Sequence, residues 1–230
     1  MRGWAWFLVG LVAATLAVGL AGLPRHDAPD APVHTHVGAR YLEEGLEETG
    51  ARNLVTAVLL NYRGFDTFVE VVVILTALLA LGALPRGTPA ARETGAVPVS
   101  PVVGYVVRLL APFIALFAVA TLVRGHSGPG GGFQAAAVFG ALVVVLSLVL
   151  ERDRVARLIP SGARPWLQAA APVAFAAVGA VGAWATGTFL GFPQDAAAHA
   201  LREGMGVALE VGIAVGGGTV LAHLFLTLEG

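Results

Sequence analysis

The chain has 230 residues, of which 57% are hydrophobic and only 13% are charged, about half the charged fraction of an average soluble domain. Its 14 basic residues, all arginine, and 15 acidic residues give a net charge of −1, so nothing in the charge balance favours nucleic acid as a partner. The absence of cysteine excludes disulfides and cysteine-ligated zinc or iron–sulfur clusters from this chain, and we expect it to bind no cofactor.

Six apolar runs are long enough to cross a bilayer, because a membrane span needs about 20 mostly apolar residues. Hydrocarbon offers no water to the backbone, so each such span must satisfy its own amides and carbonyls as a helix. The sequence therefore predicts an all-α integral membrane protein with about six transmembrane helices. The predicted spans are residues 3–23, 67–84, 101–123, 132–150, 166–190 and 204–228.

The first run, GWAWFLVGLVAATLAVGLAGL, could be a signal peptide or a retained anchor. Its apolar stretch of about 20 residues is longer than the ~7 to 15 of a signal peptide, which favours the anchor. A long segment follows, in which residues 24–37 predict an irregular loop and residues 38–62 fit a helix with an acidic side. The loop holds His26, Asp27, His34 and His36. These side chains are scattered among prolines, so we expect a solvated loop and no metal site.

The second predicted span begins with the polar stretch YRGFDTFVE. Asp66 and Glu70 stand four residues apart, on one helical face, and Arg63 lies one turn earlier. An ionisable group inside an apolar run costs at least about 2.5 kcal/mol and usually faces the bundle interior or a wet cavity, so Glu70 is a candidate for an ion path. The alternative is a structural carboxyl tied to Arg63 or to a neighbouring helix at the membrane edge.

Residues 124–134, RGHSGPGGGFQ, separate the third and fourth predicted spans. A phosphate-binding Walker loop needs a lysine, and the chain has none. The glycines instead predict a tight hairpin, and the alternative is that His126 and exposed amides line a path for ions. Glycine supplies positive φ and proline fixes one corner of such a turn. The residues concerned are Gly128, Pro129, Gly130, Gly131 and Gly132.

The last predicted span, GMGVALEVGIAVGGGTVLAHLFL, contains Glu210, about 9 Å along the helix from Gly204. It is the deepest acid of the chain. A neutral carboxyl that is hydrogen-bonded between helices would avoid the cost of burying a charge. Gly212 and Gly216 give the same helix a smooth face, which lets another helix approach closely.

Arginine counts in the loops predict the orientation of the spans. If the chain crosses the membrane six times, the N-terminus and the loops 85–100 and 151–165 share one side, and these segments hold seven arginines. Six arginines lie on the other side, partly in the long acidic segment. Long segments weigh less in this rule. We therefore expect a multi-pass protein of the cell's inner (plasma) membrane with a cytoplasmic N-terminus.

The stretch GHSGPGGGFQAA resembles the G-H-x-x-P-G-G-G-F signature of the B subunit of Mrp-type multisubunit Na⁺/H⁺ antiporters, where it also joins a transmembrane hairpin. GTFLGFP and GMGVALEVGIAVGGG resemble the third and fourth spans of that protein, which typically carries a carboxylate where Glu210 stands. The residues that match the hairpin motif are Gly125, His126, Pro129, Gly130, Gly131, Gly132 and Phe133.

Residues 38–84 resemble the small E-type subunit of membrane-bound hydrogenases, which is equivalent to the C-terminal end of the large A-type Mrp protein. The resemblance implies a fusion of a two-span E-like unit (1–84), a linker (85–100) and a four-span B-type unit (101–230). Asn61 departs from the pattern, because the A-type end usually has an acid there. The family pattern Y-R-G/A-F/L-D-T, with an acid three residues further on, is matched by Arg63, Asp66, Thr67 and Glu70.

The resemblance implies a non-pumping member of a multisubunit Na⁺/H⁺ antiporter, a secondary transporter and not an enzyme, that contributes to the ion path and to assembly. Its implied partners are large antiporter-like subunits, small membrane subunits, Na⁺, H⁺ and the lipid bilayer. One alternative is a membrane component of a respiratory complex such as a membrane-bound hydrogenase, and another is a packing scaffold without ion passage. The ion-path candidates are Arg63, Asp66, Thr67, Glu70, His126 and Glu210.

Overall fold

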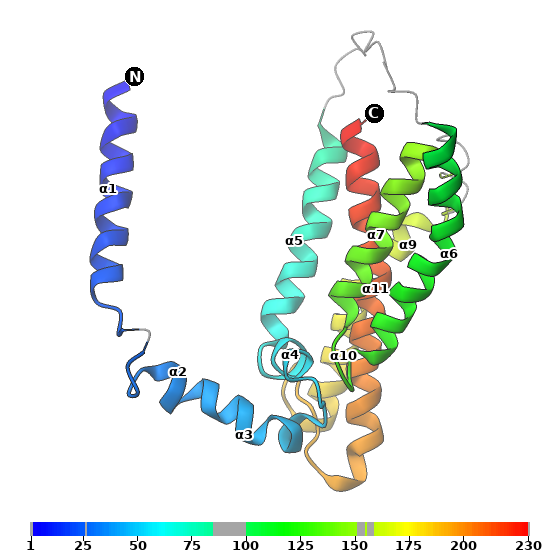
Figure 1. Cartoon of the computed structure of the whole chain (residues 1–230). Helices are drawn as coiled ribbons and strands as arrows, with labels where there is room; N and C mark the ends of the chain where they lie inside the picture. The colour runs from blue at the N-terminus through cyan, green and yellow to red at the C-terminus, as the bar shows by residue number, and fades with distance from the viewer. Residues whose placement is uncertain (1, 26, 85–99, 151–154, 156–158, 230) are drawn as a thin grey trace. The chain divides into compact units, whose positions relative to one another are not determined.

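The structure is a computed structural model that describes all residues except 1, 26, 85–99, 151–154, 156–158 and 230. Figure 1 shows that the described residues form helices joined by turns and loops, and these residues contain no β-strand. The predicted all-α fold is confirmed. The predicted linker 85–100 lies outside the described residues except for its last position.

All six predicted spans contain apolar helices, so the chain is a multi-pass membrane protein. Among the described residues, four helices are long and apolar enough to cross a membrane, and two shorter ones, α1 and α10, occupy the first and fifth predicted spans. The four long helices are α5 (Gly64–Ala83), α6 (Pro101–Arg124), α7 (Gly132–Val149) and α11 (His199–Glu229).

The fifth predicted span, 166–190, is shorter than expected and divided. Its residues form α9 (Arg164–Gln168) and α10 (Ala170–Thr186). Gly187 caps α10 with φ of 78°, the left-handed conformation that ends many helices. The chain therefore leaves the helix before the expected end at residue 190.

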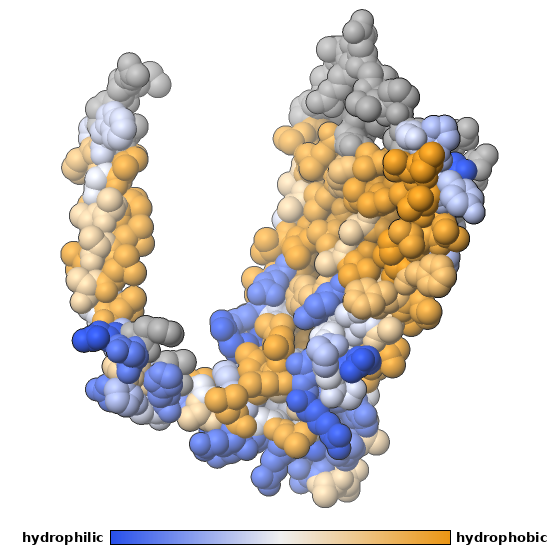
Figure 2. Space-filling model, viewed as in Figure 1, coloured by the Kyte–Doolittle hydropathy of each residue, from blue (hydrophilic) through white to orange (hydrophobic). Residues whose placement is uncertain are grey.

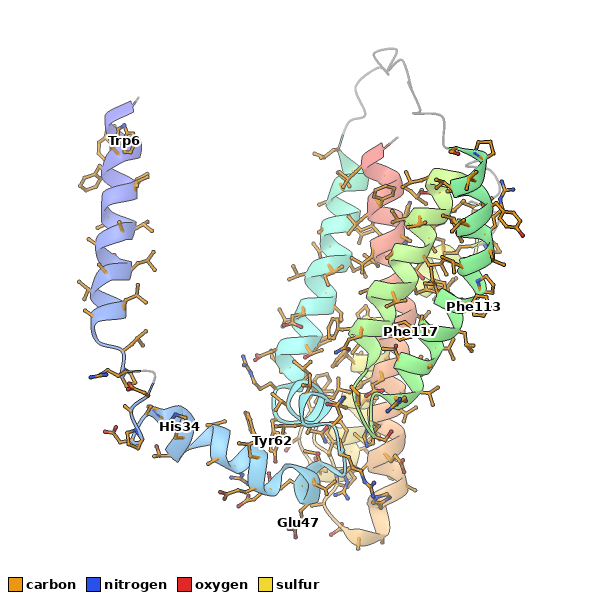
Figure 3. The ribbon with its side chains drawn as sticks, in the orientation of Figure 1. Trp6, His34, Glu47, Tyr62, Phe113 and Phe117 are labelled. Atoms are coloured by element: carbon orange, nitrogen blue, oxygen red, sulfur yellow. The ribbon has the colours of Figure 1, made fainter. Side chains whose placement is uncertain are left out.

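The chain divides into two compact units, residues 1–44 and 45–230. The first unit holds α1 (Arg2–Ala21), α2 (Pro32–Thr35) and the beginning of α3 (Val37–Thr49). The described side chains of α1 are almost all apolar and exposed, and Trp6 (Figure 3) is 74% exposed. A helix that is apolar on all sides suits a membrane environment. Within the segment 24–37, expected to be irregular, Pro32–Thr35 are helical.

In the second unit, α11 packs against α5, α7 and α10, and α6 packs against α7 (Figure 1). Two glycines of α11 allow this close approach to α10. A Cβ atom at Gly212 would lie 2.5 Å from the Cβ of Ala174, and one at Gly216 would lie 2.7 Å from the backbone nitrogen of Ala171. The smooth glycine face predicted for the last span therefore packs against α10, as small residues commonly do between membrane helices.

The buried core of this unit lies where α11 meets α5 and α10, with Phe175, Leu209 and Ile213 at most 1% exposed. Helix α6, by contrast, leaves large apolar side chains exposed. Phe113 and Phe117 of α6 (Figure 3) are 64% and 61% exposed. Figure 2 shows hydrophobic surface over this part of the unit. Such a surface suits lipid or the helices of partner proteins.

The helix expected for residues 38–62 is broken into three pieces. Gly50 has φ of +74° directly after α3, and the chain becomes helical again at α4 (Leu54–Thr56) and in the π-helix η1 (Ala57–Tyr62). The expectation of one continuous helix is wrong, because Gly50 takes a left-handed conformation that ends a helix.

The π-helix leads directly into α5 and has two supporting contacts. The backbone nitrogen of Arg63 donates to the carbonyl of Val58, five residues earlier, at 2.8 Å. The hydroxyl of Thr67, which is fully buried, donates to the carbonyl of Leu59 at 2.8 Å. Such π-bulges occur frequently at functional sites.

Candidate functional site

The hairpin between α6 and α7 is short, since α6 ends at Arg124 and α7 begins at Gly132. Gly130 and Gly131 have φ of +147° and +135°, which glycine adopts without strain. The backbone nitrogen of Gly131 donates to the carbonyl of Thr121 at 3.1 Å and closes the turn. The turn is thus the tight one that the glycines predict. Positive φ occurs at these two of the four expected glycines; Gly128 and Gly132 do not need it.

The remaining motif residues have different surroundings. Pro129 is exposed at the corner of the hairpin, whereas Phe133 is partly buried and packs against the core around Leu209. Phe133 therefore fixes the start of α7 to the bundle, and the hairpin is anchored at that end by apolar contact.

Asn53 holds the hairpin from a segment more than 70 residues earlier in the chain. Its Nδ2 donates to the carbonyls of Gly125 at 2.8 Å, Gly128 at 2.8 Å and Gly130 at 3.3 Å. Its Oδ1 accepts from the backbone nitrogen of Val55 at 3.1 Å and caps α4. One amide side chain therefore begins a helix and orients the carbonyls of the glycine loop.

We expect Asn53→Asp to lower stability by about 2 kcal/mol although it keeps the helix cap. Aspartate can still accept from Val55, but it offers no hydrogen to the carbonyls and leaves those acceptors without their partner. The measurement is thermal unfolding of the purified complex together with protease cleavage in the hairpin. Asn61→Asp, the same change at the chain's other asparagine, is the control. Equal stability of the two variants would contradict the assigned role of Asn53.

Glu210 lies buried beneath this hairpin, with 4% of the residue exposed. Its Oε1 is 3.3 Å from the hydroxyl of Thr56, which also lies 2.7 Å from the carbonyl of Gly125. A Cβ atom at Gly125 would overlap Oε2 of Glu210. A Cβ atom at Gly132 would lie 2.5 Å from the backbone oxygen of Glu210. The carboxyl therefore fits under the loop only because glycine occupies both positions.

Thr56 couples the carboxyl to the loop, because a hydroxyl carries one hydrogen. When that hydrogen is donated to Gly125, a bond between Thr56 and Glu210 requires a proton on the carboxyl. When Glu210 is ionised, a bond between the two side chains requires the hydroxyl to donate to the carboxylate instead of to Gly125. The contact of Thr56 with the hairpin is therefore linked to the protonation of Glu210, whereas the contacts of Asn53 with the hairpin are not.

His126 lies against α11 one turn from Glu210. A Cβ atom at Gly206 would be 3.2 Å from its Cε1, and Gly206 shares a helical face with Glu203 and Glu210. The Nδ1 atom of His126 is buried and has no hydrogen-bond partner within the described part of the chain. Burial lowers the pKa of His126, while Glu203 acts to raise it and His199 to lower it. The lowered pKa favours a neutral imidazole at neutral pH.

The second set of predicted residues lies at the start of α5, where some of the side chains are buried in the bundle and others are exposed. Arg63 Nε donates to Asp66 Oδ2 at 2.6 Å, and both side chains are more than half exposed. Thr67 points inward to the π-helix, as described above. Glu70 is exposed on the outer side of α5, next to Val69 and Val73, which are 45% and 59% exposed.

The structure therefore places His126 against Gly206, one turn of α11 from Glu210, whereas Glu70 is exposed on α5. In the described residues, the salt bridge of Arg63 is made with Asp66 and not with Glu70. Asn53 and Thr56, which were not predicted from the sequence, complete the site around Glu210. The one local signal for them is the stretch NLVT, in which an asparagine precedes a short apolar helix as a cap.

Two protein families match this chain. Residues 102–226 match a family described as a domain related to the MnhB subunit of Na⁺/H⁺ antiporters. Residues 9–100 match a family described as the E subunit of MBH. The chain is also similar to a curated protein of Rhizobium meliloti (strain 1021), a probable A/B subunit of a K⁺/H⁺ antiporter, with 25% identity over 211 residues. The match covers 77% of this chain but 20% of the relative, so the chain spans about one fifth of that protein's length.

Two solved structures are similar over nearly the whole chain. One belongs to the membrane-bound sulfane sulfur reductase, an archaeal respiratory membrane complex, with a TM-score of 0.70, 30% identity and coverage of 99% of this chain and 97% of that chain. The other belongs to the Mrp complex of Dietzia sp. DQ12-45-1b, with a TM-score of 0.59, 27% identity and coverage of 96% of this chain and 26% of that chain. Both similar chains are parts of larger complexes.

Proposed function

Because this chain belongs to the protein family related to the MnhB subunit of Na⁺/H⁺ antiporters, we propose that it is a non-pumping member of a multisubunit Na⁺/H⁺ antiporter and forms part of its ion path. The observation that carries this proposal is the buried carboxyl of Glu210 under the glycine hairpin, bonded to Thr56. An acid in a membrane helix is costly to bury, and acids at such positions usually mark ion or proton paths.

The contacts around Glu210 suggest how a proton and a cation exchange there. The protonated carboxyl donates to Thr56, which donates to Gly125, and the hairpin stays attached. Loss of the proton creates a negative charge that attracts a cation, and Thr56 turns toward it. His126 offers the unbonded Nδ1 as a proton acceptor one helical turn away. Competition between H⁺ and Na⁺ for one carboxylate is the exchange that an antiporter needs.

Glu70 forms the second part of the proposed path. It is exposed on the outer side of α5, so its surroundings are completed by another protein of the complex or by lipid. Asp66 and Arg63, one turn earlier, form an ion pair at the edge of the apolar run. A cation that arrives at this edge exchanges water for carboxylate oxygens. The large antiporter-like subunits and the small membrane subunits are the proposed partners.

The proposed organisation follows the two family matches. Residues 1–84 form an E-like piece and residues 101–230 a B-type piece, joined by the linker 85–100; the matched ranges 9–100 and 102–226 support this division. The arginine distribution favours a cytoplasmic N-terminus, and the proposed location is the cell's inner (plasma) membrane. The chain acts as part of a transporter and not as an enzyme.

A second candidate function is a membrane component of a respiratory complex. The similarity to the archaeal sulfane sulfur reductase complex favours it, because nearly the whole of both chains is aligned. Purifying a tagged chain with its companions separates the two candidates. Flavin, nickel or iron in the purified complex supports the respiratory function, whereas their absence together with Na⁺-dependent proton flux supports the antiporter.

The test of the proposed ion path is Glu70→Gln in the purified complex, reconstituted in liposomes. Glutamine keeps the shape and removes the charge that attracts a cation, so we expect antiport to fall to background throughout the range from about pH 7 to 9. Glu70→Asp keeps the charge on a shorter stem and should retain part of the flux with a shifted pH profile.

Glu43→Gln is the matched control, since Glu43 is exposed on α3. The flux is measured separately with Na⁺ and with K⁺, which identifies the coupled cation. An assembled Glu70→Gln complex that transports at the normal rate would make Glu70 a structural group. Normal transport after neutralisation of both Glu70 and Glu210 would favour the packing scaffold.

A further inference from the structure

A large apolar pocket lies between helices of the bundle, and α5, which carries Glu70, contributes no residue to its described lining. It has a volume of about 330 Å³ and is lined by α6, α7, α9 and α11, with Val119, Phe139, Leu167 and Val215 among the lining residues. Within the described lining, Thr219 is the one polar side chain. The pocket is roughly twice the volume of an engineered cavity of about 150 Å³ that binds benzene. Well-packed protein interiors do not leave such a space empty.

A small cavity of about 30 Å³ adjoins this pocket, and it shares Ile159 and Thr219 with the pocket lining. Unlike the pocket, it is polar at one side, where Arg164 and His223 line it. The Nδ1 of His223 lies 2.6 Å from the side-chain nitrogen of Gln168. We call these two adjoining spaces the chamber; the larger one is apolar, and basic side chains line the smaller one.

Arg164 stands at the start of α9, just before the fifth predicted span (166–190). Its guanidinium donates to the carbonyl of Ile159 at 3.4 Å, and within the described part of the chain it forms no salt bridge. Trp166, two residues later, is 79% exposed, and exposed tryptophans are typical of the lipid headgroup region. This loop belongs to the arginine-rich side of the sequence, which we assigned to the cytoplasm, where anionic lipids concentrate.

We propose that this chamber is a binding site for an anionic phospholipid, with an acyl chain in the apolar pocket and the phosphate at Arg164. A long apolar body with one negative end matches an apolar pocket that ends at a cation. A helix of a partner protein would fill the pocket but would leave the arginine without a counter-charge. Basic pockets between membrane helices on the cytoplasmic side commonly bind anionic headgroups. This site is independent of the proposed ion path.

The test measures lipids that stay bound to the whole purified complex, by native mass spectrometry after exchange into phosphatidylglycerol or phosphatidylcholine with matched chains. We expect Arg164→Gln to lower phosphatidylglycerol retention about fivefold, the factor that corresponds to about 1 kcal/mol for one arginine near anionic lipid. Phosphatidylcholine retention should stay unchanged, and Arg164→Lys should keep most of the anionic lipid. Arg108→Gln, at an exposed arginine of α6 outside both linings, is the control.

A second variant tests the acyl-chain pocket without changing charge. Val119 is 57% exposed on α6, so Val119→Phe can narrow the pocket with little effect on the fold, and Val123→Phe, at an exposed site outside the lining, is its control. We expect Val119→Phe to lower retention of both lipids. Equal retention in wild type, Arg164→Gln and Val119→Phe would overturn the proposal. So would a photo-crosslinking side chain at position 119 that captures a partner protein and no phospholipid.

Discussion

Glu210→Gln should leave the complex assembled and reduce cation-driven proton flux to background. The glutamine side chain has the shape of the protonated carboxyl, and its amide can donate to the hydroxyl of Thr56, which keeps its own bond to Gly125. We therefore expect a change in stability of less than about 1 kcal/mol. The variant cannot release a proton or attract a cation, so both halves of the exchange are lost.

The measurements are proton flux in liposomes and subunit stoichiometry by gel filtration of the same preparation. Glu47→Gln is the control, because this substitution makes the same chemical change at a residue that is exposed on α3 (Figure 3) and lies outside the bundle core. Glu210→Leu separates charge from hydrogen bonding, since leucine also removes the bond to Thr56. We expect it to weaken assembly as well as transport. An assembled Glu210→Gln complex with normal flux would show that Glu210 only joins helices.

Gly132→Val should prevent assembly of the complex before any change in ion selectivity is detectable. A Cβ atom at Gly132 would lie 2.5 Å from the backbone oxygen of Glu210 and 3.0 Å from the Cβ of Ile213. Both are held in α11 and cannot move as the end of a flexible side chain can. Forcing α7 away from α11 should cost about 3 kcal/mol, at the upper end of overpacking effects.

The same hairpin supplies a control for this prediction. A Cβ atom at Gly128 would have its nearest neighbour at 3.7 Å, an ordinary contact, so Gly128→Ala should assemble normally. The assembly of Gly132→Ala should be intermediate between that of Gly132→Val and that of Gly128→Ala, because alanine has the clashing Cβ atom but not the γ-methyl groups of valine. Assembly is followed by co-purification of the companion proteins. Normal assembly of Gly132→Val with altered cation selectivity would instead mean that the hairpin lines the ion path directly.

Both predictions depend on the contact between two segments that come from different parts of the proposed fusion. Asn53 and Thr56 belong to the E-like piece, whereas the hairpin and Glu210 belong to the B-type piece. A hydrogen bond between such segments needs both to be placed accurately, and in one chain neither segment can dissociate. Fusion therefore raises the effective concentration of each for the other.

Composition and the length of the apolar runs were enough to predict the class of the protein and the approximate places of its spans. Long apolar runs in hydrocarbon have no alternative to helical hydrogen bonding, so composition and length predict the spans. The hairpin could also be predicted from local sequence, because glycine permits positive φ and proline fixes its own φ within a few residues. The end of α10 at Gly187 and the break at Gly50 were missed, since either glycine is compatible with a helix until tertiary contacts select a left-handed conformation.

Only the tertiary structure decided which acid is enclosed and by what. Glu70 and Glu210 both interrupt apolar runs, yet one lies on an outer face and the other under a loop. Sequence spacing gives the face of a helix but not the neighbour that covers it. The glycine hairpin covers Glu210, and it is held there by Asn53 and Thr56, which lie more than 150 residues before Glu210. Such a pairing depends on how the helices pack. Packing sums many weak contacts between distant segments, which no local pattern of residues records.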